Sequence, residues 1–250
     1  MTGKKPSVMV IIPARGGSKS IPGKNIKSLG GHPLISYSIA AGIQASYVDR
    51  VIVSTDDEEI ASHARYYGAE VPFMRPARLA EDHVTDLPVF EHALLFLEKI
   101  SGTVPDIVVQ LRPTSPFRAP GCIDAAVNLL AQNQHADSVR GVTESMYTPY
   151  KMWRIRESRM EPLLDTPYDE PYNMPRQQLP KIFWQTGQIE AIRSRTIIEK
   201  KSMTGTVILP YVLDPACAVD LDTKLDWQYA EFLLERGSLN IVRPSKKPPA

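Results

Sequence analysis

The feature that most constrains the fold is a repeated alternation between short β-branched apolar runs and longer segments with helical periodicity. The apolar runs lie at Val8–Ile12, Arg50–Thr55, Asp106–Leu111 and Asp137–Val142. Continuous apolar runs of this length are typical of strands that are buried on both faces. Strands that alternate with helices form a parallel sheet with helices on both sides. The 250 residues are therefore predicted to form a single α/β domain: a three-layer α/β/α, doubly wound, mostly parallel sheet of the Rossmann-like type.

The segments between these runs carry the start signals of helices. The expected helix starts or caps are Pro33, Thr55 or Asp56, Asp86, Pro120 and Lys224. Residues 69–74 (AEVPFM) predict an edge strand that is interrupted by proline.

The alternation stops between about residues 144 and 182, where proline, tyrosine, methionine and charged residues dominate. Residues 151–155 and 159–164 are predicted to pair as a short hairpin, and residues 165–180 to form an extended arm. Because its aromatic and methionine side chains need a surface to pack on, we interpret this segment as an inserted flap. The α/β pattern then resumes with strand-like runs at residues 187–192 and 206–210 and a last helix from Lys224, and residues 243–250 are predicted to be a flexible tail.

Composition excludes several kinds of partner. The 29 basic and 28 acidic residues give a net charge of +1, which argues against a nucleic-acid binder and makes any cationic site local. No stretch approaches the ~20 apolar residues of a membrane span, so no membrane partner is expected. Cys122 and Cys217 lack the spacing of a metal or redox site, which favours a reducing compartment. The protein is therefore expected in the cytoplasm.

The loop after the first predicted strand has the composition of a phosphate-binding site. It reads IIPARGGSKSIPGKN (residues 11–25) and leaves the carboxyl end of a strand, where ligands bind in open α/β sheets. Gly16 and Gly17 permit positive φ and close backbone approach, so that consecutive amides can form an anion nest. Three cations can converge on a polyphosphate: Arg15, Lys19 and Lys24. The alternative is a solvated basic turn.

Two familiar nucleotide motifs are absent from this loop. The dinucleotide fingerprint G-x-G-x-x-G does not occur in it. The Walker A pattern nearly aligns at residues 18–25, but Ser18 replaces its first glycine and Asn25 replaces the hydroxyl residue that would hold magnesium. These mismatches point away from the ATPases.

A second motif, AVDLDT, places Asp220 and Asp222 on either side of Leu221. In extended chain the two carboxylates face the same side, and they repel each other unless a cation lies between them. Mg²⁺ is the natural cation where a phosphate also binds. The alternative is a strand end at which Asp222 or Thr223 caps the helix that begins at Lys224.

Further loops carry polar side chains toward the same rim. The LRPTSPFR loop (residues 111–118) follows a predicted strand, although an ordinary proline-rich connection has the same composition. The arginines of RPARLAED and PRQQLP are weak signals when each is taken alone. The candidates in these three loops are Arg75, Arg112, Thr114, Ser115 and Arg176.

Taken together, six motifs resemble those of the acylneuraminate cytidylyltransferases (CMP-sialic acid synthetases), in the same order. They are IIPARGGSKSIPGKN, VIVSTDDEEIA, RPARLAED, LRPTSPFR, PRQQLP and VDLDTKLDW, and the resemblance extends from about Val8 to Leu234. It implies an Mg²⁺-dependent enzyme that joins CTP to a 2-keto sugar acid, releases pyrophosphate and supplies a CMP-sugar for surface glycan synthesis. It also implies a homodimer in which the flap packs on the second subunit and helps to complete its site.

The resemblance further implies roles for individual residues. For the CTP phosphates and the adjoining nucleotide they are Arg15, Gly16, Gly17, Ser18, Lys19, Lys24, Asn25, Arg75 and Asp86. For the sugar acid they are Arg112, Thr114, Ser115, Lys151, Arg176 and Gln188. The metal is assigned to Asp220 and Asp222. Catalysis is expected to rest on Arg15, Lys24 and Asp222, because they would stabilise charge on the phosphates.

Two positions depart from the family pattern, and both lie towards the sugar. Arg112 stands where these enzymes commonly have glutamine, and residues 186–190 read TGQIE in place of NGAIY. The identity of the nonulosonic acid is therefore open. The alternatives are a cytidylyltransferase for another 2-keto sugar acid such as 3-deoxy-octulosonate, a sugar-1-phosphate nucleotidyltransferase, and a nucleotide-binding module without turnover on the same fold.

Overall fold

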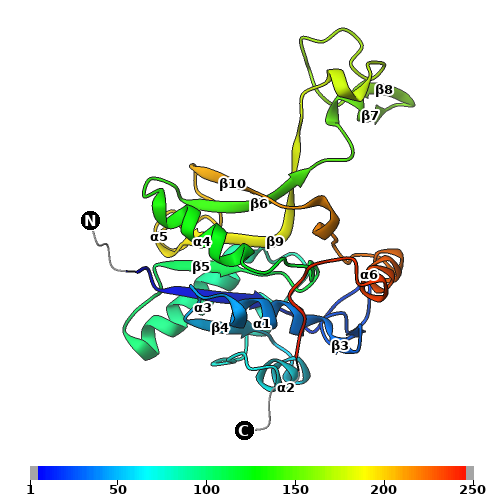
Figure 1. Ribbon diagram of the computed structural model, residues 1–250. Helices are drawn as coiled ribbons and strands as arrows, with labels where there is room; N and C mark the ends of the chain where they lie inside the picture. The colour runs from blue at the N-terminus through cyan, green and yellow to red at the C-terminus, as the bar shows by residue number, and fades with distance from the viewer. Residues whose placement is uncertain (1–4, 246–250) are drawn as a thin grey trace.

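The computed structural model describes residues 5–245, and at its centre six strands form a sheet in the order β10-β6-β9-β5-β1-β4 (Figure 1). The strands are β1 (Val8–Pro13), β4 (Arg50–Ser54), β5 (Ile107–Gln110), β6 (Ser138–Glu144), β9 (Phe183–Arg193) and β10 (Ile208–Val212). β1 pairs in parallel with β4 and β5, and β10 pairs in parallel with β6. The predicted mostly parallel α/β sheet is confirmed.

Strand β9 runs antiparallel to both of its neighbours, β5 and β6. The chain leaves the sheet at the end of β6, passes through the flap and re-enters as β9, where Phe183 pairs with Glu144. A parallel return would need a crossover connection, usually a helix, on the face of the sheet. Because the flap supplies no such crossover, the chain turns back on itself, and β9 is longer than the residues 187–192 that the pattern predicted.

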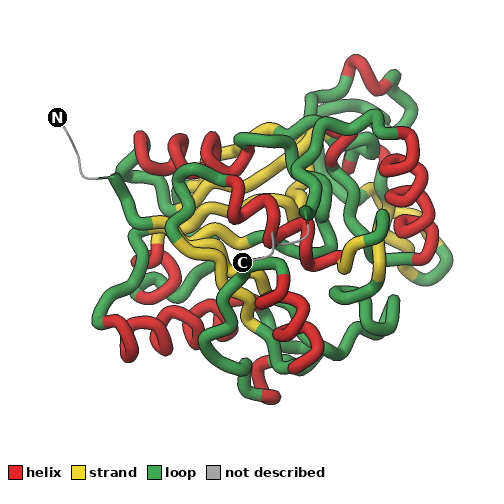
Figure 2. Tube along the Cα trace, turned by 60° about the horizontal axis from the view of Figure 1, so that its bottom comes forward, coloured by secondary structure: helices red, strands yellow, loops and turns green. Residues whose placement is uncertain are grey.

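Helices cover both faces of this sheet (Figures 1 and 2). They are α1 (Leu34–Gln44), α2 (Glu58–Tyr66), α3 (Asp86–Ser101), α4 (Cys122–Gln132), α5 (Ser194–Ile198) and α6 (Lys224–Arg236). Alternate side chains of β1 separate the layers: Val8, Val10 and Ile12 pack in the core under α1, α2 and α4, whereas Met9 and Ile11 pack under α3 and α5. A third apolar cluster fixes α6 beside the sheet through Trp227, Ala230 and Leu234, together with side chains from other segments.

The cap of α2 differs from the prediction. Asp57, and not Thr55 or Asp56, is the cap residue, and its carboxylate accepts hydrogen bonds from two amides of the first turn at 2.9 Å each. The hydroxyl of Thr55 accepts a hydrogen bond from the Asp57 amide instead, at 3.1 Å. Asp56 is thereby left to contact the loop after β1.

Two further expectations are wrong. Thr85 occupies the cap position of α3, so Asp86 is the first helical residue and its carboxylate turns toward the cleft. Residues 69–74 form no strand, since one isolated bridge between Ile52 and Glu70 is the extent of their pairing. Pro72 lacks the amide hydrogen that a β-ladder requires.

The starts of two other helices can also be compared with the prediction. The helix expected at Pro120 begins at Cys122, whereas α6 begins at Lys224 as predicted, with Thr223 and Asp226 forming a capping box.

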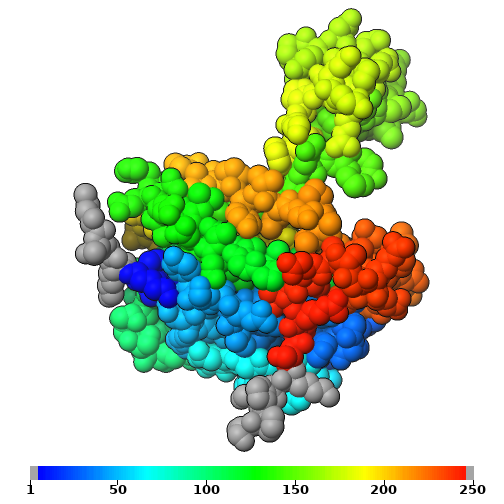
Figure 3. Space-filling view, viewed as in Figure 1, coloured from blue at the N-terminus to red at the C-terminus, as the bar shows by residue number. Residues whose placement is uncertain are grey.

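The flap projects from the end of the sheet as a separate lobe (Figure 3). It contains the predicted hairpin, formed by β7 (Trp153–Arg156) and β8 (Arg159–Pro162), and the short 3₁₀ turns η2 (Pro149–Lys151) and η3 (Arg176–Gln178). The ring of Trp153 packs 4.4 Å from that of Tyr172. Other apolar side chains of this lobe are exposed, among them Met146, Tyr147, Ile155 and Met160.

The remaining short elements connect the main ones. They are the strands β2 (Ser28–Leu29) and β3 (His32–Pro33) and the 3₁₀ turns η1 (Ala77–Leu79) and η4 (Pro215–Cys217). Of the predicted tail, residues 246–250 lie outside the described residues. Just before the tail, Val242 is buried and its amide donates to the Arg118 carbonyl at 2.8 Å. Within residues 5–245, no helix combines the length and the apolar character needed to cross a membrane.

Candidate active site

A cleft of about 240 Å³ opens at the carboxyl ends of β1 and β5. Strand ends, the loop after β1, the segment around η1 and the start of α3 form its walls. Among its lining residues are Arg15, Ser18, Lys24, Asn25, Arg75, Asp86, Arg112 and Thr114. The structure thus brings together most of the residues that were assigned to the nucleotide. Lys19 is highly exposed beside them.

Lys24 connects the loop after β1 to the AVDLDT motif. Its side chain is 10% exposed, and its amine donates to the Leu221 carbonyl at 2.7 Å and to the Asp222 carboxylate at 3.2 Å. These partners lie almost two hundred positions away in the sequence. Asn25 fixes the other side of the loop by donating to the Arg15 carbonyl at 2.9 Å. A buried amine held in this way is available to a phosphate without further ordering.

The two more exposed cations of the loop share one partner. Asp82, from the RPARLAED segment, pairs with Arg15 at 2.7 Å and also with Lys19. The hydrogen bond from Lys19, and then that from Arg15, lower the pKa of the Asp82 carboxyl below its ordinary value. Both cations therefore converge on one carboxylate of the protein itself, whereas Lys24 pairs with Asp222, and the convergence of all three cations on a polyphosphate stays a prediction.

The glycines of this loop do not act as expected. Neither Gly16 nor Gly17 has a positive φ, and the Gly16 amide donates to the Asp56 carboxylate at 3.1 Å. A side chain at residue 16 is nevertheless excluded, because a Cβ there would lie 2.7 Å from a carboxylate oxygen of Asp57. Gly16 thus permits close packing against the cap of α2, and the expectation of a nest built on left-handed glycines is wrong.

Arg75 is held beneath the cleft by the end of β4. Its guanidinium donates to the Ser54 hydroxyl at 3.1 Å and to the Ser54 carbonyl, and its own amide donates to the Thr55 carbonyl at 2.7 Å. Burial lowers the pKa of Arg75 to about 10, so the side chain stays charged at neutral pH. It presents a fixed positive charge at the wall of the cleft.

Asp220 and Asp222 flank the buried Leu221, in the alternation expected of extended chain. Asp220 accepts a hydrogen bond from the Ser115 hydroxyl at 3.3 Å, and the Leu221 amide donates to the Thr114 carbonyl at 2.8 Å. No group of three or more His, Cys, Asp or Glu residues within residues 5–245 is arranged to hold a metal. Two carboxylates beside a phosphate site suit Mg²⁺, which binds through one or two carboxylates together with substrate phosphates and water.

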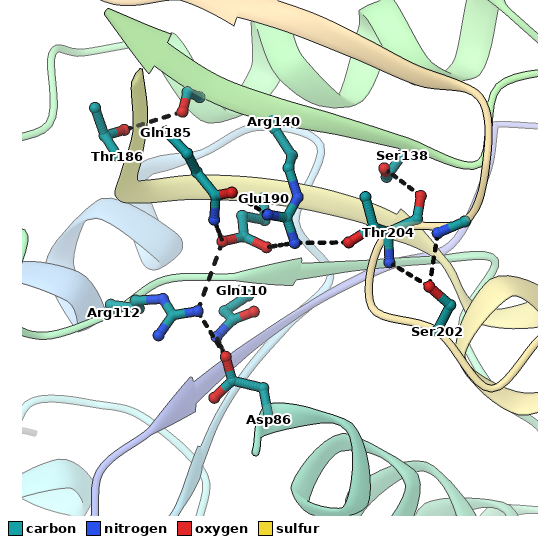
Figure 4. Close-up of polar contacts among 12 residues, drawn as sticks. Asp86, Gln110, Arg112, Ser138, Arg140, Gln185, Thr186, Glu190, Ser202 and Thr204 are labelled. Carbon is teal, nitrogen blue, oxygen red and sulfur yellow. Dashed lines mark hydrogen bonds and ion pairs between the residues drawn. The ribbon is translucent and has the colours of Figure 1, made fainter. Parts of the chain in front are cut away.

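A network of charges extends from Arg112 and Asp86 in the wall of the cleft into the sheet (Figure 4). Arg112 pairs with Asp86 at 2.6 Å and lies 3.7 Å from Glu190. Glu190, on β9, also pairs with Arg140 of β6 at 3.0 Å and accepts a hydrogen bond from Gln185 at 3.1 Å. Glu190 and Arg140 were not predicted as site residues, although Glu190 lies within the segment that departs from the family pattern.

The family model for cytidylyltransferases matches residues 9–235, which is nearly the whole chain. The chain belongs to the cytidylyltransferase family. CMP-N,N'-diacetyllegionaminic acid synthase of Legionella pneumophila is 34% identical, over 94% of this chain and 99% of that protein. N-acylneuraminate cytidylyltransferase of Escherichia coli O18:K1:H7 is 30% identical, over 89% of this chain and 51% of that protein. The family predicted from the six motifs is confirmed.

Structural likeness agrees with the fold of this family. A solved structure of CMP:2-keto-3-deoxy-manno-octonic acid synthetase complexed with CTP superposes with a TM-score of 0.67 at 16% identity. The match covers 92% of this chain and 99% of that one. The predicted Rossmann-like nucleotidyltransferase fold is thereby confirmed.

Of the residues that the resemblance assigned to the sugar, Arg112 and Thr114 line this cleft, whereas Ser115, Lys151, Arg176 and Gln188 lie outside it. Gln188 is fully buried behind it, where its amide donates to the carbonyls of Phe117, at 3.0 Å, and of Cys217. Lys151 is exposed on the flap. Arg176, also on the flap, donates to the Ser145 carbonyl at 2.6 Å and lines a separate cavity of about 390 Å³.

Proposed function

We propose that this protein is a cytidylyltransferase that joins CTP to a nonulosonic (sialic-type) acid and releases a CMP-sugar and pyrophosphate. The observation that carries the proposal is the contact of the buried Lys24 with Asp222, which joins the phosphate loop to the carboxylate motif. The CMP-nonulosonic acid synthases among its relatives support the same substrates. The free thiols of Cys122 and Cys217 fit the cytoplasmic location that we also propose.

In this reaction the anomeric C2 hydroxyl of the sugar acid attacks the α-phosphorus of CTP. A bond forms between that oxygen and phosphorus, the bond to the bridging oxygen breaks, and pyrophosphate leaves with the electron pair while the hydroxyl loses its proton. Such transfers depend on positioning and on charge neutralisation. Lys24 and Arg15 are placed to neutralise the phosphates, since both line the cleft. Arg75, buried in the wall, would hold the nucleotide beside them.

Mg²⁺ is the proposed cofactor, and Asp220 and Asp222 would hold it. When bound, the ion would neutralise charge on the phosphates of CTP. The contact between Lys24 and Asp222 keeps one of these carboxylates turned toward the phosphate loop. The Ser115 hydroxyl donates to the other carboxylate, Asp220.

We further propose a homodimer in which the flap of one copy lies against the other. The exposed apolar side chains of the flap support this proposal, because contiguous exposed apolar surface marks interaction sites. Lys151 and Arg176, which lie outside the cleft of their own chain, would then serve the site of the second copy.

A substrate screen tests the proposed function. The purified protein is incubated with Mg²⁺, one of the four nucleoside triphosphates and one of several acceptors: sialic, legionaminic, pseudaminic and deaminated nonulosonic acids, or 3-deoxy-octulosonate. Release of pyrophosphate and formation of the sugar nucleotide are both measured. Activity with CTP and a nonulosonic acid is expected. Preference for 3-deoxy-octulosonate, preference for another nucleotide, or binding of CTP without turnover would each overturn the proposal.

A further inference from the structure

Arg112 and Asp86 form a pair of opposite charges in the wall of the cleft, which the loop after β1 also lines. Both contacts recorded for the Arg112 guanidinium, to Asp86 and to Glu190, use the same nitrogen, Nη2. Its Nε and Nη1 make no hydrogen bond within the described residues, and the side chain is 37% exposed. On Asp86, the oxygen Oδ2 accepts from Arg112 and from Gln110, whereas Oδ1 has no donor among residues 5–245. The pair therefore offers free donors beside a free acceptor at the cleft.

Glu190 supports this pair from inside the sheet. Its side chain is 1% exposed and lies between the guanidiniums of Arg112 and Arg140 (Figure 4). Burial raises the pKa of Glu190, and the two guanidiniums oppose that shift. A buried carboxylate is stable only when it is paired and hydrogen-bonded, so Glu190 restricts where Arg112 can lie. The Gln185 amide and the Arg140 ion pair in turn fix Glu190.

The backbone of β9 also shapes the position of Arg112. A Cβ at Gly187 would lie 2.9 Å from Cδ of Arg112 and 2.6 Å from the hydroxyl oxygen of Ser115. A larger residue at this point would displace the Arg112 side chain from its path over the strand. Gly187 is common to TGQIE and NGAIY, whereas Glu190 departs from the family pattern and lies beside the other departure, Arg112, so that these two residues form one structural unit.

The charges of four side chains, Asp86, Arg112, Arg140 and Glu190, cancel, because two carboxylates face two guanidiniums. A neutral surface of this kind gives little attraction to a second anionic group on the acceptor. It matches a group that accepts one hydrogen bond and donates another, such as a secondary amide, whose carbonyl would face Arg112 while its N–H faces Asp86.

We propose that Arg112 and Asp86 together recognise an acylamino group of the sugar acid, and that Glu190 is the positioning residue that holds Arg112 in place for this contact. The proposal rests on the proposed function, since it names the feature by which that acceptor is selected.

The test compares three acceptors that carry no, one or two acylamino groups: deaminated nonulosonic acid, N-acetylneuraminic acid and N,N'-diacetyllegionaminic acid. For the unaltered protein, kcat/KM is expected to rise by about tenfold or more at one of the two steps, as expected for a buried hydrogen-bonded contact. Arg112→Gln should remove most of that rise in kcat/KM. Glu190→Gln should make the rise about fivefold smaller by increasing the KM for the acceptor. The KM for CTP should stay within about twofold of normal.

Glu70→Gln is the control, because Glu70 pairs with Arg50 on the edge strand β4, away from Arg112, and it should leave the selectivity unchanged. If Glu190→Gln fails to fold, Arg112→Gln decides the outcome, since Arg112 is partly exposed. Two outcomes would overturn this inference alone. In the first, product forms but the ratio of kcat/KM between the acceptors is the same in all folded variants. In the second, Glu190→Gln slows the reaction of all acceptors equally. Absence of CMP-sugar with every acceptor would instead overturn the proposed function.

Discussion

The cleft and the flap differ in whether their side chains already have partners. In the cleft, Lys24 and Arg75 are buried and hydrogen-bonded within one chain. In the flap, Ile155 is 76% exposed, and Tyr147 and Met160 are exposed beside it. Pre-organised cations support binding of CTP by a single copy. An exposed apolar lobe fits the proposed contact with another copy. The contrast is between a cleft whose cations are already held in place and a lobe whose apolar surface is uncovered in a single chain.

The largest effect is expected at the centre of the cleft. Lys24→Ala should reduce CMP-sugar formation by about 1000-fold, because it removes a fixed charge from the phosphates and the link to Asp222. Pyrophosphate release measures the loss, and thermal melting checks the fold. Lys5→Ala, which removes an exposed contact to the Ser46 carbonyl, should leave turnover unchanged. Near-normal turnover of folded Lys24→Ala would show that the buried cation of the cleft does not serve the reaction.

The metal assignment is tested at Asp222. Asp222→Asn keeps the size of the side chain and should lower turnover by about 100-fold, with a higher Mg²⁺ concentration required for half-maximal rate. Titration of Mg²⁺ at saturating CTP measures both effects. A folded variant with normal turnover and an unchanged Mg²⁺ requirement would show that Asp222 holds no metal.

The flap is tested by complementation between copies. Arg176→Ala should reduce turnover by about tenfold when it is assayed alone. Mixed with Lys24→Ala, it should restore about a quarter of normal turnover, because half of the randomly mixed dimers would hold one intact site. Light scattering reports the mass of each mixture. A monomeric mass, or no recovery in mixed dimers, would contradict a flap that acts across the dimer.

A smaller effect is expected where a side chain of the protein competes with CTP. Asp82→Asn should lower the KM for CTP by about threefold, since it frees Arg15 and Lys19 from an exposed ion pair. Steady-state kinetics at two salt concentrations measure the change. Glu58→Gln, which removes a carboxylate from an exposed pair with Arg65, is the control for overall charge. A raised KM would mean that Asp82 orders the loop for CTP.

The smallest effect on turnover is expected at Asp137, which lies at the amino end of β6, whereas the flap begins at the carboxyl end of that strand. The bonds from Lys200, at 2.5 Å, and from the Thr206 and Val207 amides hold the pKa of Asp137 well below its ordinary value of 3.8. Asp137→Asn should cost about 2 kcal/mol of stability at neutral pH, or roughly 5 °C in the melting temperature.

The pH dependence of that loss gives a second check. Because the native pKa is lower than the unfolded one, the carboxylate stabilises the fold fully above about pH 4, and this stabilisation is lost as the pH falls toward the native pKa. Melting curves of both proteins should therefore converge in acid. A constant difference between them at every pH would show that the charge of Asp137 is not the cause.

The parts that follow from local pattern were predictable from the sequence. Continuous apolar runs predicted four strands of the sheet. The motifs predicted that the loop after β1 and the two aspartates of AVDLDT serve one site; the structure brings Lys24 and Asp222 into contact, while the binding of CTP and metal by these residues stays a prediction. Contacts between distant polar residues leave no periodic signal. The pairing of Asp82 with Lys19 and the ion pair of Glu190 with Arg140 were therefore missed. The direction of β9 depends on the path of the flap, and local propensity does not encode that path.

The two ends of the flap lie side by side in the sheet, where Glu144 pairs with Phe183. A segment with adjacent ends can be exchanged for a related one without altering the route of the remaining chain. Residues 145–182 form the whole flap, so one contiguous exchange would replace the surface proposed to contact a second copy, while β9 with Gly187 and Glu190 stays in the sheet. The surface offered to a partner can thus change by recombination of a single cassette, while the sheet and the cleft are inherited unchanged.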